Sequence, residues 1–300
     1  MTRTASASPS ASAANRGRWW RRWVRRLAKG VAARVPTVHD LLMRAPFSRR
    51  AHLVPLLFGG TEVLRWRGLV IEVEVGEYEG YYRYFAGTGP ELEIEWLETH
   101  CAGSQVLFDI GANQGFVALA VARACPQLRV VAFEPDPVNA ARLRRNIGWN
   151  PGLAHRIELV ELAVGAATGT AYFETAGGMN SGTGKVAGSG SGRRQVGVTT
   201  VAEYCATHGV RPDVIKIDVE GAEADVLSGL GPVADTLSGL VVEIHHDQPT
   251  PPDREAFVQR LRAHLARLPL TFRYLIDERD WLERPPEPWP KRFHAFGERD

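Results

Sequence analysis

The feature that most constrains the fold is a short apolar strand that ends in a glycine-containing turn and continues into an apolar helix. Residues 106–109 predict the strand, and residues 116–125 predict the helix. The same alternation recurs along the chain, with further strands expected at 129–133, 157–164, 214–219 and 240–244. Units of this length predict a doubly wound α/β fold, in which a mostly parallel sheet has helices on both faces.

The helix after the second strand has clear start signals. Asp136 is expected to cap its first backbone amides, and Pro137 occupies the first helical position. Further along, residues 254–268 carry apolar residues at helical spacing, and residues 272–276 and 292–296 predict an antiparallel pair that closes the sheet. Ligands of such sheets bind beyond the carboxyl ends of the parallel strands, so the chemistry is expected there.

Composition divides the chain into parts. The expected parts are a basic N-terminal arm (1–50), an N-terminal cap (51–100) and the main domain (101–300). Within the cap, residues 63–84 predict one or two strands and residues 91–100 a helix, and this region is expected to help select the substrate. Two further segments are a hairpin-like strand at 170–174 and a flexible glycine- and serine-rich loop at 177–192.

Charge is unevenly distributed along the chain. Residues 1–50 hold twelve arginines or lysines and one acid, so the arm carries +11 while the remaining residues carry −9. An acidic body is a poor partner for a phosphate backbone, so nucleic acid is not expected as a partner. Two interpretations of the arm stay open: a solvated extension, and a peripheral contact with an anionic membrane surface or an acidic partner.

Cysteine usage and hydropathy bear on the cellular location. Cys101, Cys125 and Cys205 are scattered, without a CxxC pair or metal-ligand spacing, which argues against a disulfide scaffold or a zinc site. No run of about 18 uncharged apolar residues predicts a membrane-spanning helix. The stretch after the arginine cluster also lacks the apolar core of a secretory signal. The sequence therefore predicts a cytoplasmic protein.

The turn after the first strand, in VLFDIGANQGF, is the first candidate site. Gly111 and Gly115 allow a tight turn and a close approach of the backbone to a ligand. Asn113 stands where a dinucleotide-binding turn has its second glycine, the one that admits the pyrophosphate. Asp109 and Asn113 instead offer polar groups, which suit a ligand with a cationic amino-acid end and no phosphates. S-adenosylmethionine is such a ligand.

The second candidate site is FEPDP, at the end of the second strand. Glu134 follows Asp109 by 25 residues and is positioned to accept hydrogen bonds from both hydroxyls of a ribose. The alternative is an ordinary surface glutamate.

Candidate proton-handling residues follow the fourth and fifth strands. Alternation places Lys216, Asp218 and Glu220 on one face of the strand. An alcohol is a poor nucleophile until its proton is removed by a base, or by a metal ion that lowers its pKa. The expected catalytic set is Lys216, Asp218, Glu220, His245 and His246, and a magnesium ion, if used, is expected at Asp218, Glu220 and Glu243. Ordinary loop hydrogen bonding is the alternative for each histidine.

Three blocks, in the order DIGANQG, FEPDPVNAARLRRNI and IKIDVEGAEADVLSG, resemble the signature blocks of the FkbM-type methyltransferases. The resemblance covers about residues 100–246. It implies the seven-stranded, Rossmann-like fold of class I methyltransferases, S-adenosylmethionine as donor, and a hydroxyl acceptor on a sugar, polyketide or other natural product. By position it implies cofactor contacts from Asp109, Gly111, Ala112, Asn113, Gly115, Glu134 and Asp218, and from the backbone at Ala163.

Other functions were weighed against O-methylation. A nicotinamide-dependent oxidoreductase on the same fold is disfavoured by the missing central glycine of the turn. N-methylation is disfavoured because the fourth strand is followed by Asp-Val-Glu-Gly, where such enzymes often carry Asn/Asp-Pro-Pro-aromatic. A non-catalytic module that binds S-adenosylmethionine is the third alternative.

Overall fold

The computed structural model describes residues 61–299 apart from 75–80, 82–83, 86, 88–90, 175–184, 188–193, 247–250 and 277–279. The basic arm predicted at 1–50 and most of the loop predicted at 177–192 therefore lie outside the described residues. Within the described part of the chain, no helix is both long and apolar enough to cross a membrane.

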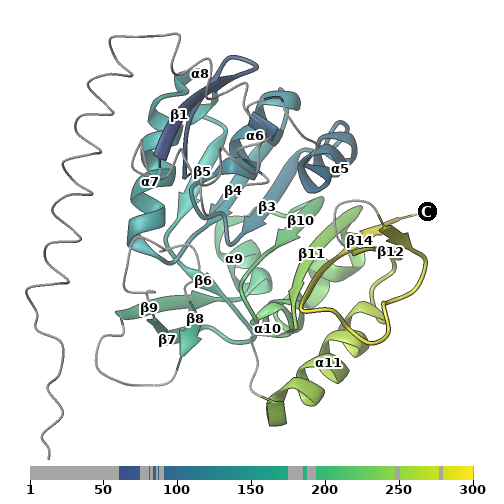
Figure 1. The fold of residues 1–300 in the computed structure, drawn as a ribbon. Coiled ribbons are helices and arrows are strands. Elements are labelled where there is room, and N and C mark those ends of the chain that lie inside the picture. Colours follow the sequence, from purple (N-terminus) through teal and green to yellow (C-terminus); the bar gives the residue numbers. More distant parts are fainter. Residues whose placement is uncertain are drawn as a thin grey trace, which may run out of the picture.

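A mixed sheet forms the centre of the molecule (Figure 1). Its five parallel strands are β3 (Val106–Ile110), β4 (Arg129–Phe133), β5 (Ile157–Val160), β10 (Val214–Ile217) and β11 (Gly239–His245). The strand β14 (Arg292–Glu298) runs antiparallel to β11, and β12 (Thr271–Ile276) runs antiparallel to β14. The described order is β13-β12-β14-β11-β10-β3-β4-β5. The predicted doubly wound fold and its closing antiparallel pair are confirmed.

The sheet has one strand more than the seven that were predicted. The additional strand, β13 (Asp280–Leu282), pairs with β12 at the edge of the sheet. It is three residues long and follows β12 closely, so it extends the edge without changing the order of the other seven.

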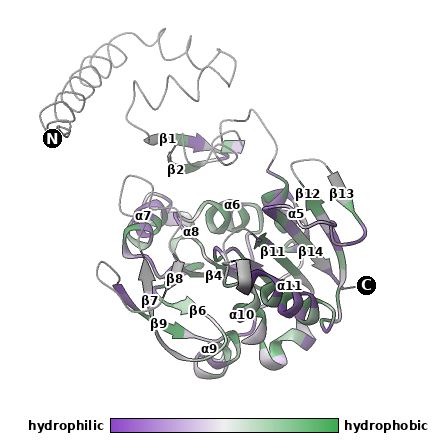
Figure 2. Cartoon of the chain, turned by 60° about the horizontal axis from the view of Figure 1, so that its bottom comes forward, coloured by the Kyte–Doolittle hydropathy of each residue, from purple (hydrophilic) through white to green (hydrophobic). Residues whose placement is uncertain are grey.

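Helices cover both faces of the sheet because successive strand residues point to opposite sides. Leu107 joins the core under α5 (Leu92–His100), α6 (Phe116–Ala124), α7 (Pro137–Gly148) and α8 (Pro151–Ala154). Phe108, the next residue, joins the core under α9 (Val201–His208), α10 (Glu223–Ser228), the 3-10 helix η1 (Gly231–Thr236) and α11 (Pro251–Leu265). Residues 116–122 of α6 are all apolar and all buried, and the helix is coloured mostly green in Figure 2.

The strand predicted at 157–164 is wrong as a single element. The structure divides it into β5 in the main sheet and β6 (Ala163–Val164) in a second sheet of order β6-β9-β7-β8. The other strands of that sheet are β7 (Gly169–Glu174), β8 (Lys185–Ala187) and β9 (Arg194–Thr199). The division occurs because the pairing of β5 with β4 ends at Phe133 and Val160, after which the chain pairs with β9 instead.

A hairpin of β1 (Thr61–Trp66) and β2 (Leu69–Glu74) packs beside α7. Asn150 accepts a hydrogen bond from Val70 N at 2.8 Å and donates one to Val70 O at 2.8 Å. Asn146 accepts from Glu72 N at 3.1 Å and donates to Gln114 O at 2.9 Å. The backbone hydrogen-bonding groups at the edge of the hairpin are thus paired with two side chains of the main domain. One of these side chains, Asn146, also holds the turn before α6.

Candidate functional site

The turn between β3 and α6 depends on its glycines. Gly111 and Gly115 have φ angles of 82° and 85°, in the left-handed region that glycine adopts without strain. A Cβ atom on Gly111 would lie 1.8 Å from the carbonyl oxygen of Asp218, and one on Gly115 would lie 2.1 Å from Leu143 Cδ1. The turn is therefore pressed against the end of β10 on one side and against α7 on the other.

Glu134, at the end of β4, holds this turn in place. One carboxylate oxygen accepts a hydrogen bond from Asn113 N at 2.8 Å, and the other accepts one from Asp136 N at 2.8 Å. The side chain is buried, and burial raises its pKa to about 8 against the lowering effect of these two amides. Asp136 caps α7 through Val138 N at 2.7 Å, and Pro137 opens the helix, so the predicted helix start is confirmed.

Lys216 and Asp109 lie beneath the turn. Both are buried, with Lys216 Nζ 3.5 Å from Asp109 Oδ1, 3.4 Å from Asp218 Oδ2 and 3.3 Å from the carbonyl oxygen of Gly111. Burial lowers the pKa of Lys216, but the charges of Asp218 and Asp109 outweigh it and raise the pKa above its ordinary value. Lys216 is therefore a buried cation held between Asp109 and Asp218, and its expected catalytic part stays a prediction.

Two other residues of the expected cofactor set have limited exposure. Ala112 is buried within the turn, and its amide donates to Phe133 O at 2.9 Å. Ala163 belongs to β6 and pairs with Val198 of β9 in the second sheet. Only backbone or edge contacts with a ligand are therefore available to these two residues.

Four carboxylates surround one histidine at the ends of β10 and β11. We call Asp218, Glu220, Glu223, Glu243 and His245 the acid–histidine cluster. His245 is fully buried, and its Nδ1 donates a hydrogen bond to Glu223 Oε1 at 2.7 Å. Its Nε2 lies 3.8 Å from Asp218 Oδ1, 3.5 Å from Glu220 Oε2 and 3.6 Å from Glu243 Oε1. Burial lowers the pKa of His245, but the bond to Glu223 and the neighbouring carboxylates raise it to about 9.

Local backbone geometry aims Glu220 into the cluster. Glu220 has a φ angle of 53°, a left-handed conformation that costs energy in a residue other than glycine, and Gly221 follows with a φ angle of 103°. Glu223 Oε1 accepts the amide of Gly221 at 2.9 Å as well as the bond from His245. The Asp-Val-Glu-Gly turn and α10 thus present their carboxylates to the same imidazole.

The structure separates the two candidate histidines. His245 ends β11 and points to the face that carries Lys216 and Glu243. His246 follows the strand and contacts the ring of Trp289 edge-on, with ring centroids 5.8 Å apart. The expectation of His246 in the proton-handling set therefore has no geometric support among the described contacts.

Two residues of β14 were not expected in the site. Antiparallel pairing sets His294 opposite Glu243 and Arg292 opposite His245. Arg292 Nε lies 3.2 Å from Glu243 Oε1, and His294 Nε2 lies 3.8 Å from Glu243 Oε2. The alternation Arg-Phe-His in the sequence is the signal that could have indicated them, but only the register of the pair reveals the contact.

The N-terminal cap also reaches the site. Glu93, in the first turn of α5, is buried and accepts a hydrogen bond from Tyr81 OH at 3.1 Å. Burial raises the pKa of Glu93 to about 7, opposed by Lys216 and reinforced by Asp218. The charge of Asp218 raises the pKa of both Glu93 and Tyr81, so these two groups of the cap lie within electrostatic range of Asp218.

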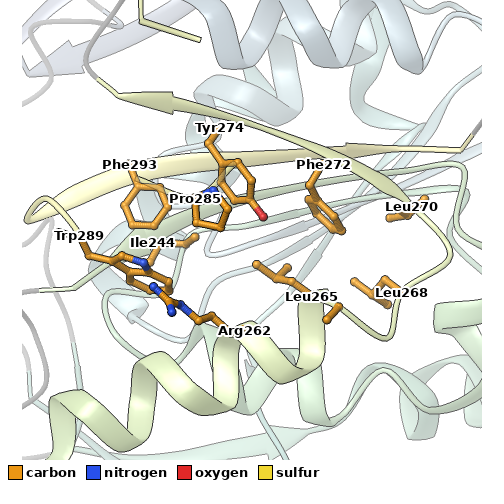
Figure 3. Close-up of a pocket in the computed structure, with 11 residues that line it drawn as sticks. Ile244, Arg262, Leu265, Leu268, Leu270, Phe272, Tyr274, Pro285, Trp289 and Phe293 are labelled. Atoms are coloured by element: carbon orange, nitrogen blue, oxygen red, sulfur yellow. The ribbon is translucent and has the colours of Figure 1, made fainter. Parts of the chain in front are cut away.

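A separate cavity of 300 Å³ lies on the other face of the sheet, against α11 (Figure 3). Its lining is mostly apolar: Ile244 and Phe293 come from the strands, Leu265 comes from α11, and the ring of Trp289 lies against Phe293 with centroids 5.0 Å apart. Arg262 stacks over Trp289 with its guanidinium carbon 5.2 Å from the ring centroid. Ile244 lies between Glu243 and His245 in sequence, so the cavity and the acid–histidine cluster are on opposite sides of β11.

The sheet order, the glycine turn and the carboxylate that anchors it define a doubly wound α/β protein with a ligand-binding turn after β3, and the family match identifies its class as methyltransferase. More narrowly, the chain belongs to the FkbM methyltransferase family, because the model of the methyltransferase FkbM domain matches residues 109–268.

Relatives in this class include two named enzymes. The chain is 29% identical over 181 residues to the hexuronic acid methyltransferase AglP of Haloferax volcanii, covering 59% of this chain and 72% of AglP. It is 31% identical over 143 residues to the 2-O-methyltransferase NoeI of Sinorhizobium fredii, covering 41% of this chain and 56% of NoeI.

Solved structures similar to this chain include the methyltransferase FkbM from Methylobacillus flagellatus, with 16% identity and a TM-score of 0.44 over 89% of this chain and 60% of that chain. They also include the O-methyltransferase TomG from Streptomyces achromogenes, with 13% identity and a TM-score of 0.44 over 75% of this chain and 88% of TomG.

Proposed function

We propose that the protein transfers the methyl group of S-adenosylmethionine to a hydroxyl group of a sugar. The observation that carries this proposal is the junction at Asp218, whose carbonyl packs against Gly111 while its side chain faces His245. The expected cofactor turn and the acid–histidine cluster therefore share one residue. A methyl donor and an acceptor hydroxyl placed on either side of it would be neighbours.

The residues of the turn suit this cofactor in their chemistry. Glu134 offers carboxylate oxygens that can accept hydrogen bonds from ribose hydroxyls. The cation nearest the turn, Lys216, is directed to Asp109 and Asp218 and is buried away from a pyrophosphate site. S-adenosylmethionine supplies an activated methyl group, and the backbone of 111–115 together with Glu134 would hold its nucleoside and amino-acid ends.

The chain's part in the transfer is to position the acceptor and to accept its proton. With S-adenosylmethionine bound, the acceptor oxygen would take the methyl group as the carbon–sulfur bond breaks, leaving S-adenosylhomocysteine. A carboxylate of the acid–histidine cluster would accept the hydroxyl proton. Tyr81 and Glu93 of the cap would close the site on its acceptor side and limit the entry of water.

A sugar acceptor is supported by the names of the two relatives, a hexuronic acid methyltransferase and a 2-O-methyltransferase. The test is incubation of the purified chain with S-adenosylmethionine labelled in its methyl group and a panel of hexose and hexuronic acid glycosides. Methyl ethers at sugar hydroxyls are expected. Calorimetric titration with S-adenosylmethionine and with NAD separates the cofactor question from the acceptor question, and preference for NAD would overturn the proposal.

A further inference from the structure

The Nε2 atom of His245 is a buried polar atom without a hydrogen bond. It points toward the carboxylates of Asp218 and Glu220, and one ligand atom from each of the three residues lies within 4.8 Å of the others. A buried imidazole nitrogen normally has a hydrogen-bond partner. Here three carboxylate oxygens lie 3.5 to 3.8 Å from it, too far for a hydrogen bond.

The other nitrogen of the ring is held as in a metal-binding histidine. Nδ1 donates to Glu223 Oε1 at 2.7 Å, and Glu223 is itself fully buried. Histidines that bind metal ions almost always donate their second ring N–H to a carboxylate, a carbonyl or a water, which fixes the tautomer and makes the ligating nitrogen more basic. This bond leaves Nε2 as the nitrogen directed at Asp218 and Glu220.

We propose that Asp218, Glu220 and His245 bind a divalent first-row transition metal ion such as Mn²⁺. Donor atoms about 2.1 Å from a common ion lie about 3 to 3.5 Å apart. The separation of 3.5 Å to Glu220 lies within this range and that of 3.8 Å to Asp218 slightly above it, and the three donor atoms, which lie within 4.8 Å of one another, would draw together around an ion. A set of one imidazole and two carboxylates favours a transition ion over Mg²⁺, which prefers oxygen ligands throughout.

Glu243 is not part of this ligand set, although the sequence predicted it as a magnesium ligand in place of His245. Its Oε1 lies 3.2 Å from Arg292 Nε, and its Oε2 lies 3.8 Å from His294 Nε2. The two β14 residues therefore hold Glu243 beside the proposed ion, 3.6 Å from His245 Nε2. Three protein ligands leave further coordination positions open for oxygens of a ligand.

The part of the ion in methyl transfer rests on the proposed function, whereas its binding does not. A sugar hydroxyl oxygen in an open position would be polarised by the ion, and its proton would pass to the adjacent carboxylate of Glu243. The oxygen then forms its bond to the methyl carbon while the carbon–sulfur bond breaks. Neighbouring hydroxyls of a sugar could occupy two open positions at once, which would orient the acceptor.

The test measures Mn²⁺ binding to the full chain without S-adenosylmethionine or sugar, from the loss of the electron paramagnetic resonance signal of free Mn²⁺. One bound ion per chain is expected, and it should persist in a tenfold excess of Mg²⁺. His245→Gln should weaken binding at least about tenfold. The matched control is His246→Gln, which changes the adjacent histidine that contacts Trp289 and should bind Mn²⁺ as the unchanged chain does.

Glu220→Gln provides a second variant in case the buried histidine is needed for folding. The Glu220 side chain is partly exposed, so its substitution tests the ligand set with less disturbance of the core. Absence of Mn²⁺ binding, equal binding by His245→Gln and by the unchanged chain, or displacement by equimolar Mg²⁺ would overturn the metal site. Methyl transfer that proceeds unchanged in a chelator would remove the ion from the reaction while leaving the proposed function intact.

Discussion

The two halves of the site differ in the groups that form them: the half at β3 and β4 consists mainly of backbone groups, and the half at β10 and β11 of charged side chains. At the β3–β4 end, backbone amides and glycines form the turn. Glu134 links Asn113 to the start of α7 because it accepts hydrogen bonds from the amides of Asn113 and Asp136. At the β10–β11 end, four carboxylates surround His245, and Arg292 of β14 contacts one of them, Glu243. Added side-chain volume should disrupt the first half, whereas loss of a charge should disrupt the second. Substitutions in the two halves should therefore affect different measurable properties.

The largest effect is expected from Gly111→Ala. Its Cβ would meet the backbone carbonyl of Asp218 at 1.8 Å, and neither backbone can move without disturbing β3 or β10. We expect a loss of about 3 kcal/mol or more in the free energy of unfolding, together with loss of cofactor binding. Denaturant unfolding measures the first and calorimetry the second.

The matched control is Gly148→Ala, at the end of α7, where an added Cβ meets nothing within 4 Å. Because alanine favours helix, this variant should be unchanged or more stable by up to about 1 kcal/mol. Equal stability of the two alanine variants would show that the contact at Gly111 does not constrain the turn.

The next largest effect is expected from removing one negative charge, which should lower turnover much more than cofactor affinity. Asp218→Asn keeps the shape of the side chain but removes a carboxylate that faces Lys216 and His245. We expect turnover to fall about 100-fold or more. The Kd for S-adenosylmethionine should change only a few-fold, as measured by calorimetry beside a methyl-transfer assay. A loss confined to cofactor affinity, with turnover at saturation unchanged, would assign Asp218 to the cofactor half alone.

A smaller effect is expected when the acceptor for the ribose is removed. Glu134→Gln retains one oxygen but introduces an amide that repels the N–H of Asn113 or Asp136, since both already donate to this side chain. We expect the Kd for S-adenosylmethionine to rise about tenfold, with a smaller change in turnover at saturation. Cofactor affinity within two-fold of the unchanged chain would contradict the ribose assignment.

The smallest effect is the pH dependence of cofactor binding. Burial raises the pKa of Glu134 to about 8, so the free protein carries a proton there at neutral pH. Ribose hydroxyls that donate to the carboxylate would favour its ionised form, so binding releases this proton and affinity rises with pH until about pH 8. We expect a gain of about tenfold or less between pH 7 and pH 9. Glu134→Gln should abolish the part of this dependence due to Glu134, and an identical profile in that variant would exclude the group.

The cofactor half was largely predictable because its signals are local. The strand β4 has the predicted bounds, β3 extends one residue further, and Asp136 and Pro137 start α7 as expected. Gly111 and Gly115 were singled out for their freedom of backbone conformation, and both have positive φ angles. Each of these features depends on neighbours within a few residues, which is the range over which a sequence pattern is informative.

The acid–histidine half was only partly predictable. The sequence indicated Asp218, Glu220 and His245, but it treated His245 and His246 as equivalent. The two histidines differ because successive residues of a strand point to opposite faces and β11 ends at His245. The end of a strand is the feature that a sequence pattern predicts least accurately, so the sequence could not distinguish them. The contact of Arg292 with Glu243 depends on the register of β11 with β14, which joins residues that are far apart in the chain.

The sequence by itself determined the alternation of strands and helices, the glycine turn and the family of the chain, since these are written in contiguous residues. Only the tertiary structure decided which charged side chains lie close together in the site. Ala163 pairs with β9 in the second sheet and not with the main sheet. Glu93, on α5, lies within electrostatic range of Lys216. The physical reason is that local propensity acts over one or two turns of chain, whereas the approach of two side chains requires strand register and helix packing to be complete.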